Sequence, residues 1–314
     1  MAKIWEEYRG YRFCQKYVNL STRSTFRSIQ IAGLENVPQQ GAVLLAPNHC
    51  ATLMDPLLIL AALRRPVGFG ARSDIFAKPR IAKILRWLRI VPLARERNGL
   101  TEVAKNFAVF DEIIDCIGHD VPFCMYAEGV HRAARGMLPV KKALFRIAKM
   151  AREQLGKPVF IVPVGVNFEY FFRGQGRVRM RFGEPVEIGE AFARHAGEPE
   201  AEIYRALCEE LREADLALIG PEMERRHGRR LLRALGALLS LPLFALCAVG
   251  SILIWLPLRL IMRGMKDKAW THTVRYALHF VLPLFWIFHI PFERLLNFYA
   301  NLLEDLHGTG SSQA

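Results

Sequence analysis

The stretch Val43-Leu-Leu-Ala-Pro-Asn-His49-Cys-Ala-Thr-Leu-Met-Asp55-Pro56 joins an apolar run to the start of a helix. The run Val43–Leu45 is typical of a strand buried on both faces, and Asp55-Pro56 is a strong helix start because proline suits the first helical position. In α/β folds, loops at the carboxyl ends of buried strands usually build the sites. The stretch therefore predicts an α/β fold with a site near His49.

Outside this stretch, the first two thirds of the chain alternate between strand-like and helix-like segments, which predicts an α/β fold with a mixed sheet flanked by helices. Strands are expected at Ser28–Leu34, Gly41–Ala46, Val67–Ala71, Pro122–Tyr126, Val159–Val164, Arg177–Phe182 and Val186–Ile188. Helices are expected at 3–20, Pro56–Leu63, Ile81–Leu88, Glu102–Ile117, Lys141–Gln154 and Glu198–Ile219. We expect an N-terminal amphipathic helical segment at 1–27, an α/β domain at 28–220, and a C-terminal hydrophobic helical hairpin with a tail at 221–314.

The formal net charge of +13 over 314 residues calls for an anionic partner. Nucleic acid, an anionic membrane surface and a phosphorylated substrate are the candidates. Nucleic acid is disfavoured because five of the arginines gather at 225–233, beside an apolar segment, and no nucleic-acid-binding motif is present. The six cysteines form no CxxC pair, which disfavours both a zinc site and a secreted disulfide framework and indicates a reducing compartment.

Hydrophobic residues concentrate near the carboxyl end of the chain. Ala234–Leu258 contains no charged residue and would be roughly 37 Å long as a helix, enough to cross a ~30 Å hydrocarbon layer. A second, shorter apolar run follows at Tyr276–Phe292. The alternative is a pair of buried core helices. Because basic clusters flank the first segment on both sides, we favour a hairpin that dips into one leaflet or lies in the interface over one that spans.

His49 and Asp55 are candidates for a base and the carboxylate that orients it. Six positions along one helix would separate the two side chains by about 240°, so they meet only if the chain turns between them. If they meet, the carboxylate fixes the imidazole tautomer and leaves one ring nitrogen free to take a proton. The alternative makes Asp55 a helix N-cap and His49 a strand-end residue. A thiol-nucleophile role for Cys50 is disfavoured because neighbouring side chains on extended backbone point apart.

Three later segments add polar groups beside apolar runs. Arg95 and Arg97 follow Val91-Pro-Leu-Ala and form either a phosphate clamp or a solvated basic loop. The predicted strand Pro122–Tyr126 is followed by a carboxylate, a glycine and basic residues: Glu128, Gly129, His131 and Arg132. The predicted strand Val159–Val164 carries Pro163 and is followed by Gly165, where backbone can approach a ligand.

Taken in order, these segments resemble the glycerolipid (PlsC-like) acyltransferase family. Asn48-His49…Asp55 resembles the family's NH-x4-D block, and Arg95 its arginine block. Glu128-Gly129 resembles the PEGTR block, and Val162-Pro-Val164 the fourth block. The resemblance covers residues 28 to 190, so that the α/β domain at 28–220 is expected to be the catalytic domain.

The sequence departs from the family pattern in two places. Five residues, not four, separate His49 from Asp55. In the third block Ala127 replaces the usual proline, Val130 the threonine and His131 the arginine, with Arg132 one place later. Both departures are similar to the fungal-type glycerol-3-phosphate and dihydroxyacetone-phosphate acyltransferase branch. They leave open which basic residue of the third block contacts substrate, and whether the acceptor is lysophosphatidate.

The resemblance implies an O-acyltransferase that moves a fatty acyl group from a thioester to a hydroxyl of a glycerophosphate or lysophospholipid acceptor. His49, oriented by Asp55, would deprotonate that hydroxyl. Substrate-contacting roles are implied for Asn48, Arg95, Arg97, Glu128, Gly129, His131, Arg132 and Pro163. We further expect backbone N–H groups near Val164 and Gly165 to stabilise the oxyanion.

The resemblance also implies the partners of the chain. Acyl-CoA or an acyl carrier protein thioester is the co-substrate, and neither a further cofactor nor a metal is expected. Membrane lipid is expected as a partner and nucleic acid is not, with the catalytic domain facing the cytoplasm, at the inner membrane in a bacterium. The alternative is a non-catalytic lipid-binding or scaffolding protein on the same fold. The intact His49, Asp55 and Glu128 disfavour that alternative.

Overall fold

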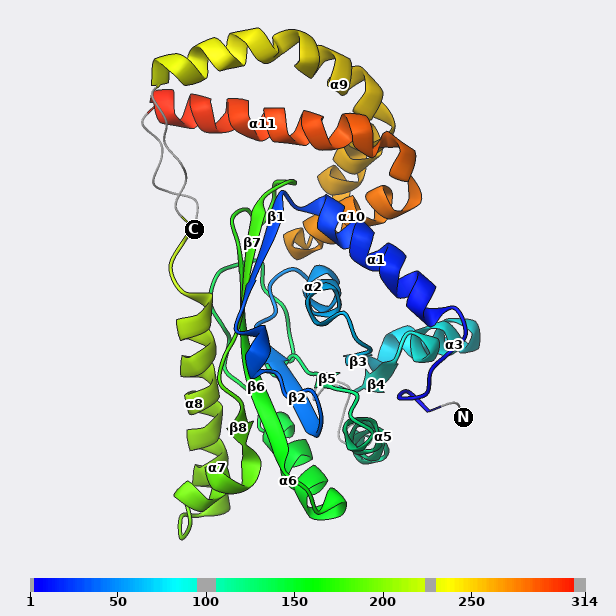
Figure 1. Ribbon diagram of the computed structural model, residues 1–314, viewed down its shortest axis with the longest axis vertical. Coiled ribbons are helices and arrows are strands. Elements are labelled where there is room, and N and C mark those ends of the chain that lie inside the picture. The colour runs from blue at the N-terminus through cyan, green and yellow to red at the C-terminus, as the bar shows by residue number, and fades with distance from the viewer. Residues whose placement is uncertain (1–2, 95–105, 224–229, 308–314) are drawn as a thin grey trace.

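The computed structural model describes residues 3–94, 106–223 and 230–307 and contains an eight-stranded sheet in this part of the chain (Figure 1). The strands are β1 (Ser28–Ala32), β2 (Ala42–Pro47), β3 (Gly68–Arg72), β4 (Ile90–Leu93), β5 (Phe123–Cys124), β6 (Val159–Phe168), β7 (Arg177–Phe182) and β8 (Val186–Glu187). Along the sheet the order is β1-β7-β6-β2-β5-β3-β4, and β8 pairs with β6. The predicted mixed α/β sheet is confirmed.

The centre of the sheet is parallel. β2 lies between β5 and β6 and runs parallel to both, with Leu45 in register with Cys124 and Val162. All six residues of β2 are buried, as expected for a strand that is covered on both faces. β7 and β8 run antiparallel to β6. The carboxyl ends of β2, β5 and β6 therefore meet at one edge of the sheet, which is the edge where His49 lies.

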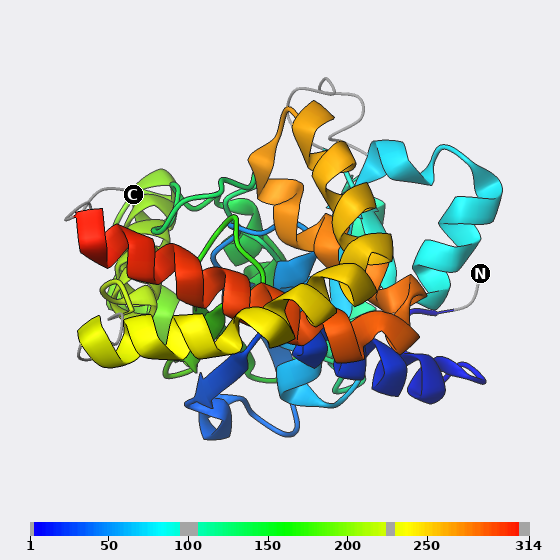
Figure 2. The same cartoon turned by 90° about the horizontal axis from the view of Figure 1, so that it is seen from above.

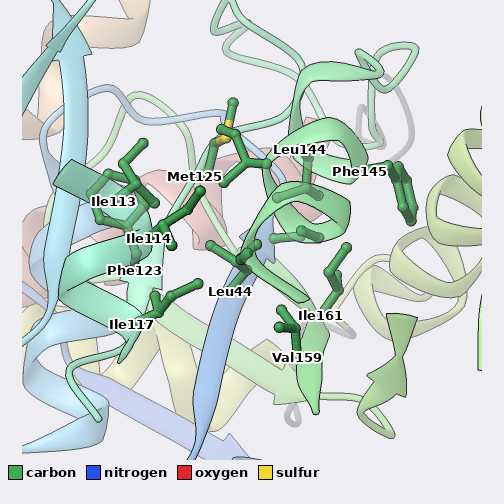
Figure 3. Packing of buried hydrophobic residues seen from close by; sticks show 14 of the residues in the cluster. Leu44, Ile113, Ile114, Ile117, Phe123, Met125, Leu144, Phe145, Val159 and Ile161 are labelled. Carbon is green, nitrogen blue, oxygen red and sulfur yellow. The ribbon is translucent and has the colours of Figure 1, made fainter. Parts of the chain in front are cut away.

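Helices cover both faces of the sheet. One face packs against α5 (Asn106–Gly118), α6 (Ala143–Leu155), α7 (Ile188–Arg194) and α8 (Glu200–Ile219). Figure 3 shows this core, where Leu44 and Ile161 of neighbouring strands gather with Ile113 of α5 and Leu144 of α6. The other face packs against α2 (Met54–Leu63), with α1 (Tyr11–Thr25) beyond it. A short helix α3 (Pro79–Trp87) lies beside β4.

The C-terminal helices lie across one end of the sheet. They are α9 (Arg230–Gly264), α10 (Thr271–Val281) and α11 (Trp286–His307), with the short turns η4 (Lys268–Trp270) and η5 (Pro283–Phe285) between them. α9 and α11 run side by side, and α10 packs against α1 (Figures 1 and 2). By length and composition Leu231–Gly264 is apolar enough to cross a membrane. The apolar run Tyr276–Phe292 is bent by 101° where η5, which starts at Pro283, separates α10 from α11.

Two local predictions were wrong. The N-terminal helix begins at Tyr11 and not near residue 3. The buried guanidinium of Arg89 donates hydrogen bonds to the carbonyl oxygens of Ile4 and Glu6, at 2.5 and 2.9 Å. These carbonyls are therefore not available for the hydrogen bonds of a helix. β4 was not predicted as a strand. It contains Pro92 and pairs with β3 alone, and proline is tolerated on an edge strand.

Candidate active site

The carboxyl end of β2 is clamped to β6 by a buried asparagine. The Asn48 side chain donates from Nδ2 to the carbonyl of Val166 at 3.0 Å and accepts at Oδ1 from the N–H of Val166 at 2.7 Å. Both ends of this amide are therefore used on the neighbouring strand. A substrate contact was expected of Asn48, but in this structure its side chain bonds to the backbone of β6. It thereby fixes the position of the next residue, His49.

His49 and Asp55 are in direct contact. After His49 the chain turns through Thr52, whose φ of 49° is left-handed, and α2 starts at Met54. His49 Nδ1 lies 2.7 Å from Asp55 Oδ2, and Asp55 is fully buried. The same oxygen accepts the N–H groups of Cys50 and Ala51 at 2.9 and 2.8 Å. The alternative of Asp55 as N-cap is wrong, because Leu53 occupies that position.

The ring of His49 is held so that one nitrogen stays available. The Asp55 carboxylate accepts two backbone N–H groups, so it also acts as the acceptor toward His49. Nδ1 of His49 then carries the hydrogen and donates it to Asp55, which leaves a lone pair on Nε2. The ring stacks on Tyr126 at a centroid distance of 4.2 Å and meets the ring of His131 edge-on at 5.5 Å. Its side chain is 18% exposed, and no described residue bonds to Nε2. This geometry suits a general base.

Glu128 supports the backbone at the site. Its carboxylate accepts the N–H of His49 at 2.6 Å through Oε1 and the N–H of Leu138 at 2.8 Å through Oε2. Burial raises the pKa of Glu128, and the two N–H donors act in the opposite direction. The following residue, Gly129, has a φ of +71°, where a side chain would be strained. Glu128 thus links the backbone of His49 to that of Leu138. Both of its carboxylate oxygens already accept a backbone N–H group.

Replacing Glu128 with glutamine is expected to destabilise the fold. Glutamine offers one acceptor oxygen and an NH2 donor, so one of the two backbone N–H groups loses its partner and faces another donor. An unsatisfied buried donor costs about 1–3 kcal/mol, and we expect the free energy of unfolding in detergent to fall by about this amount. Glu184→Gln, at an exposed position, is the control. An unchanged unfolding midpoint for Glu128→Gln would contradict the double-acceptor role.

The connection between α9 and α10 reaches this site. Asp267 Oδ2 lies 2.7 Å from Nε2 of His131, and this hydrogen bond lowers the pKa of Asp267. Thr273 Oγ1 lies 2.7 Å from Oγ1 of Thr52 in the turn between His49 and Asp55. The sequence analysis missed Asp267 and Thr273. Asp267 could have been noticed in the sequence, because it is the one acidic residue in the basic segment between Arg259 and Arg275.

The remaining predicted site residues are placed as follows. Arg132 is exposed, and its N–H donates to the carbonyl of His49 at 3.1 Å, which puts it next to the base. Arg95 and Arg97 lie outside the described residues. Pro163 and Gly165 are on the α8 side of β6, where a Cβ on Gly165 would overlap Leu218 and Ile219. The substrate contact expected of Pro163 and the oxyanion site expected near Val164 and Gly165 stay predictions.

Cys50 is unsuited to be a nucleophile. The residue is 2% exposed, and its Sγ lies 3.9 Å from Asp55 Oδ1. Burial, together with the nearby carboxylates of Asp55 and Glu128, raises the pKa of the thiol well above its ordinary value. Since the thiolate is the reactive form, this environment disfavours a nucleophilic role for Cys50.

Comparison with known proteins agrees with this geometry. Residues 28–167 match the family model described as Acyltransferase. Among solved structures, the crystal structure of the 1-acyl-sn-glycerophosphate (LPA) acyltransferase PlsC from Thermotoga maritima matches with a TM-score of 0.50 and 21% identity, over 69% of this chain and 84% of that one. A comparison with curated protein sequences gave no match. Residues 28–167, from before Asn48 to beyond Pro163, thus match an acyltransferase family model, and the chain shares the fold of the PlsC structure.

Proposed function

We propose that this protein is a membrane-bound O-acyltransferase that moves a fatty acyl group from a thioester to a hydroxyl of a glycerophosphate or lysophospholipid acceptor. The observation that carries the proposal is the 2.7 Å contact between His49 and the fully buried Asp55 in an acyltransferase domain. A buried carboxylate on one ring nitrogen and an open second nitrogen form the arrangement that general-base catalysis at a hydroxyl requires.

The proposed reaction needs no covalent acyl-enzyme. Nε2 of His49 takes the proton of the acceptor hydroxyl while the hydroxyl oxygen attacks the thioester carbonyl. Asp55 stabilises the imidazolium that forms. When the tetrahedral intermediate collapses, the carbon–sulfur bond breaks and the thiolate leaves with the proton from His49. The products are an ester and a free thiol. General-base assistance contributes about 10²–10⁴ in rate.

An acceptor that carries a phosphate agrees with the charge around the base. Arg132 is exposed beside His49, and the chain has a net charge of +13. Arg95 and Arg97, outside the described residues, remain the proposed phosphate clamp. The PlsC protein of Thermotoga maritima is named for a phosphate-bearing acceptor, 1-acyl-sn-glycerophosphate. Arg95, Arg97 and Arg132 are therefore the proposed phosphate contacts.

Acyl transfer by the detergent-solubilised protein tests the proposed function. Labelled acyl-CoA, and separately acyl carrier protein thioester, is offered with glycerol-3-phosphate or lysophosphatidate as acceptor. Labelled ester formed from one of these acceptors supports the proposal and identifies the step. A protein that binds vesicles but forms no ester with a wider panel of lysolipids would instead be the non-catalytic lipid-binding protein that the sequence analysis kept as an alternative.

The outer surface of the C-terminal helices supports membrane attachment. α9 presents large apolar side chains outward along its whole length, among them Leu239 at 80% and Val249 at 74% exposed. α11 lies between α9 and the α/β domain and is tied to the β6–β7 loop, where Asn297 donates to the carbonyl of Gly174 at 2.6 Å. α9 and α11 lie side by side across one end of the domain (Figure 1). This arrangement favours helices that lie in the plane of one membrane leaflet over a hairpin that spans the membrane.

We expect the protein to stay in the membrane fraction after washing with about 1 M salt, because at that ionic strength charges are screened within about 3 Å while apolar burial is retained. The measurement is sedimentation of washed membranes, followed by detection of the protein in pellet and supernatant. A peripheral protein held by charge alone serves as the control for the wash. Complete release of this protein by salt would contradict the attachment through α9.

A further inference from the structure

A second cluster of polar residues lies in the C-terminal helices, apart from the His49–Asp55 pair. It consists of His279 on α10 and His289 and Glu293 on α11. The two histidines are fully buried and Glu293 is 4% exposed. One side-chain ligand atom from each residue lies within 4.8 Å of the other two. The proposed function assigns no role to this cluster.

The imidazole nitrogens of this cluster lack partners. Among the described residues, no hydrogen bond reaches Nδ1 or Nε2 of His279, Nδ1 or Nε2 of His289, or Oε2 of Glu293. A buried polar atom without a partner costs about 1–3 kcal/mol, so five such atoms in one place call for a ligand that satisfies several at once. The two rings meet edge-to-face at a centroid distance of 5.0 Å, so their nitrogens can be directed at a shared point.

The helices hold the three groups in position before any ligand binds. His289 and Glu293 are one turn apart on α11, which places them on the same face. His279 meets them from α10 because the chain bends by 101° at the junction. Arg275 Nε donates to Glu293 Oε1 at 2.8 Å and so orients the carboxylate, and this oxygen lies 3.7 Å from Nε2 of His289. Gly174 packs so closely that a Cβ there would overlap the Glu293 carboxylate.

We propose that His279, His289 and Glu293 bind one divalent transition-metal ion of the zinc class and that this ion fastens α10 to α11. Two imidazoles and one carboxylate are a donor set used for zinc, with a fourth coordination position left for water or another group. Magnesium and calcium fit less well because they favour sets made entirely of oxygen ligands. Arg275, which donates to Glu293 Oε1, would be the supporting partner that orients the ligating carboxylate.

The sequence alone gave no sign of this site, and no metal was expected from it. His279 and His289 are separated by ten positions with a proline between them, which matches no metal-binding motif. The bend at η5 brings them together. His279 of the cluster is on α10, the helix whose Thr273 contacts Thr52. The proposed role is therefore structural, and it is independent of the acyl-transfer proposal.

Metal analysis of the full chain tests this proposal. The protein is solubilised in detergent, freed of any histidine tag, incubated with zinc and desalted, and its metal content is measured by plasma mass spectrometry. We expect about one equivalent of zinc in the wild type and at least tenfold less in His279→Gln and in His289→Gln. His272→Gln is the matched control, since His272 is a buried histidine of α10 that bonds to the carbonyl of Tyr170 and lies outside the cluster.

Two further readouts keep the proposal falsifiable if a variant fails to fold. Cobalt added to the metal-free wild type should give the visible absorption of a low-coordinate histidine site, and zinc should abolish it. A chelator should lower the thermal midpoint of the wild type and of His272→Gln. Wild-type protein that retains no zinc and gives no cobalt absorption overturns the proposal. Equal zinc contents in the wild type and in both folded cluster variants would do the same.

Discussion

His49→Ala is expected to lower the rate of acyl transfer by about 10²–10⁴-fold, the contribution of a general base. The fold should survive, because Asp55 keeps the N–H groups of Cys50 and Ala51 as partners when the ring is removed. The ring is partly exposed and stacks on Tyr126, so its loss leaves a gap at the surface of the site and not in the core. Loss of rate without loss of structure is the expected combination.

The measurement is the initial rate of labelled ester formation, with circular dichroism and thermal unfolding of the same samples. His195→Ala is the matched control. That histidine also pairs with carboxylates, Glu198 and Glu210, but it lies between α7 and α8, far from α10 (Figure 1). A rate for His49→Ala within a few-fold of the control would rule out His49 as the base.

Asp55→Asn is expected to lower kcat by about 10²–10³-fold with little change in KM and with a loss of stability no larger than that of Glu128→Gln. The asparagine oxygen can take the place of Oδ2 and accept the same three hydrogens, from Nδ1 of His49 and the N–H groups of Cys50 and Ala51. Geometry is then retained and only the negative charge is lost. The imidazolium that forms during proton transfer loses its counter-charge, so the defect belongs to the transition state.

Steady-state kinetics of the single variants and of His49→Ala/Asp55→Asn separate this role from a structural one. If Asp55 acts through His49, adding Asp55→Asn to a chain that already lacks the ring should change the rate very little, because residues that act as a unit are not additive. A full further loss in the double variant would show that Asp55 acts on its own. A large fall in the unfolding midpoint of Asp55→Asn would assign the aspartate to stability.

The sequence was most informative where local patterns coincide with burial. The apolar β2 followed by Asn48, His49 and Asp55-Pro56 was enough to place a candidate site at the end of a buried strand, and the alternation of segments along the chain predicted the fold class. The contact between His49 and Asp55 depended on a turn between them, which the structure contains. Arg177–Phe182 was predicted with the right bounds because its buried residues alternate with partly buried ones. In these places local propensity and tertiary packing point the same way.

Contacts between distant parts of the chain could not be predicted in this way. Nothing near Arg89 indicates that its guanidinium binds the carbonyl of Ile4 and displaces the start of α1. The pairing of His131 with Asp267 joins residues 136 positions apart, and it depends on the packing of α10 against α1 and α2. Such pairings are set by the three-dimensional packing of helices, which a single sequence does not encode locally.

Because Asp267 contacts His131 and Thr273 contacts Thr52, the surroundings of the His49–Asp55 pair are complete only after these later residues are synthesised. The His49–Asp55 pair emerges from the ribosome early, but the residues that contact His131 and Thr52 emerge more than two hundred residues later. α1 also gains one of its contacts late, because the hydroxyl of Tyr17 donates to the carbonyl of Phe280. A nascent chain that has not yet released α10 therefore lacks these contacts around His49, and the proposed base gains them together with the helices proposed to attach the protein to its lipid.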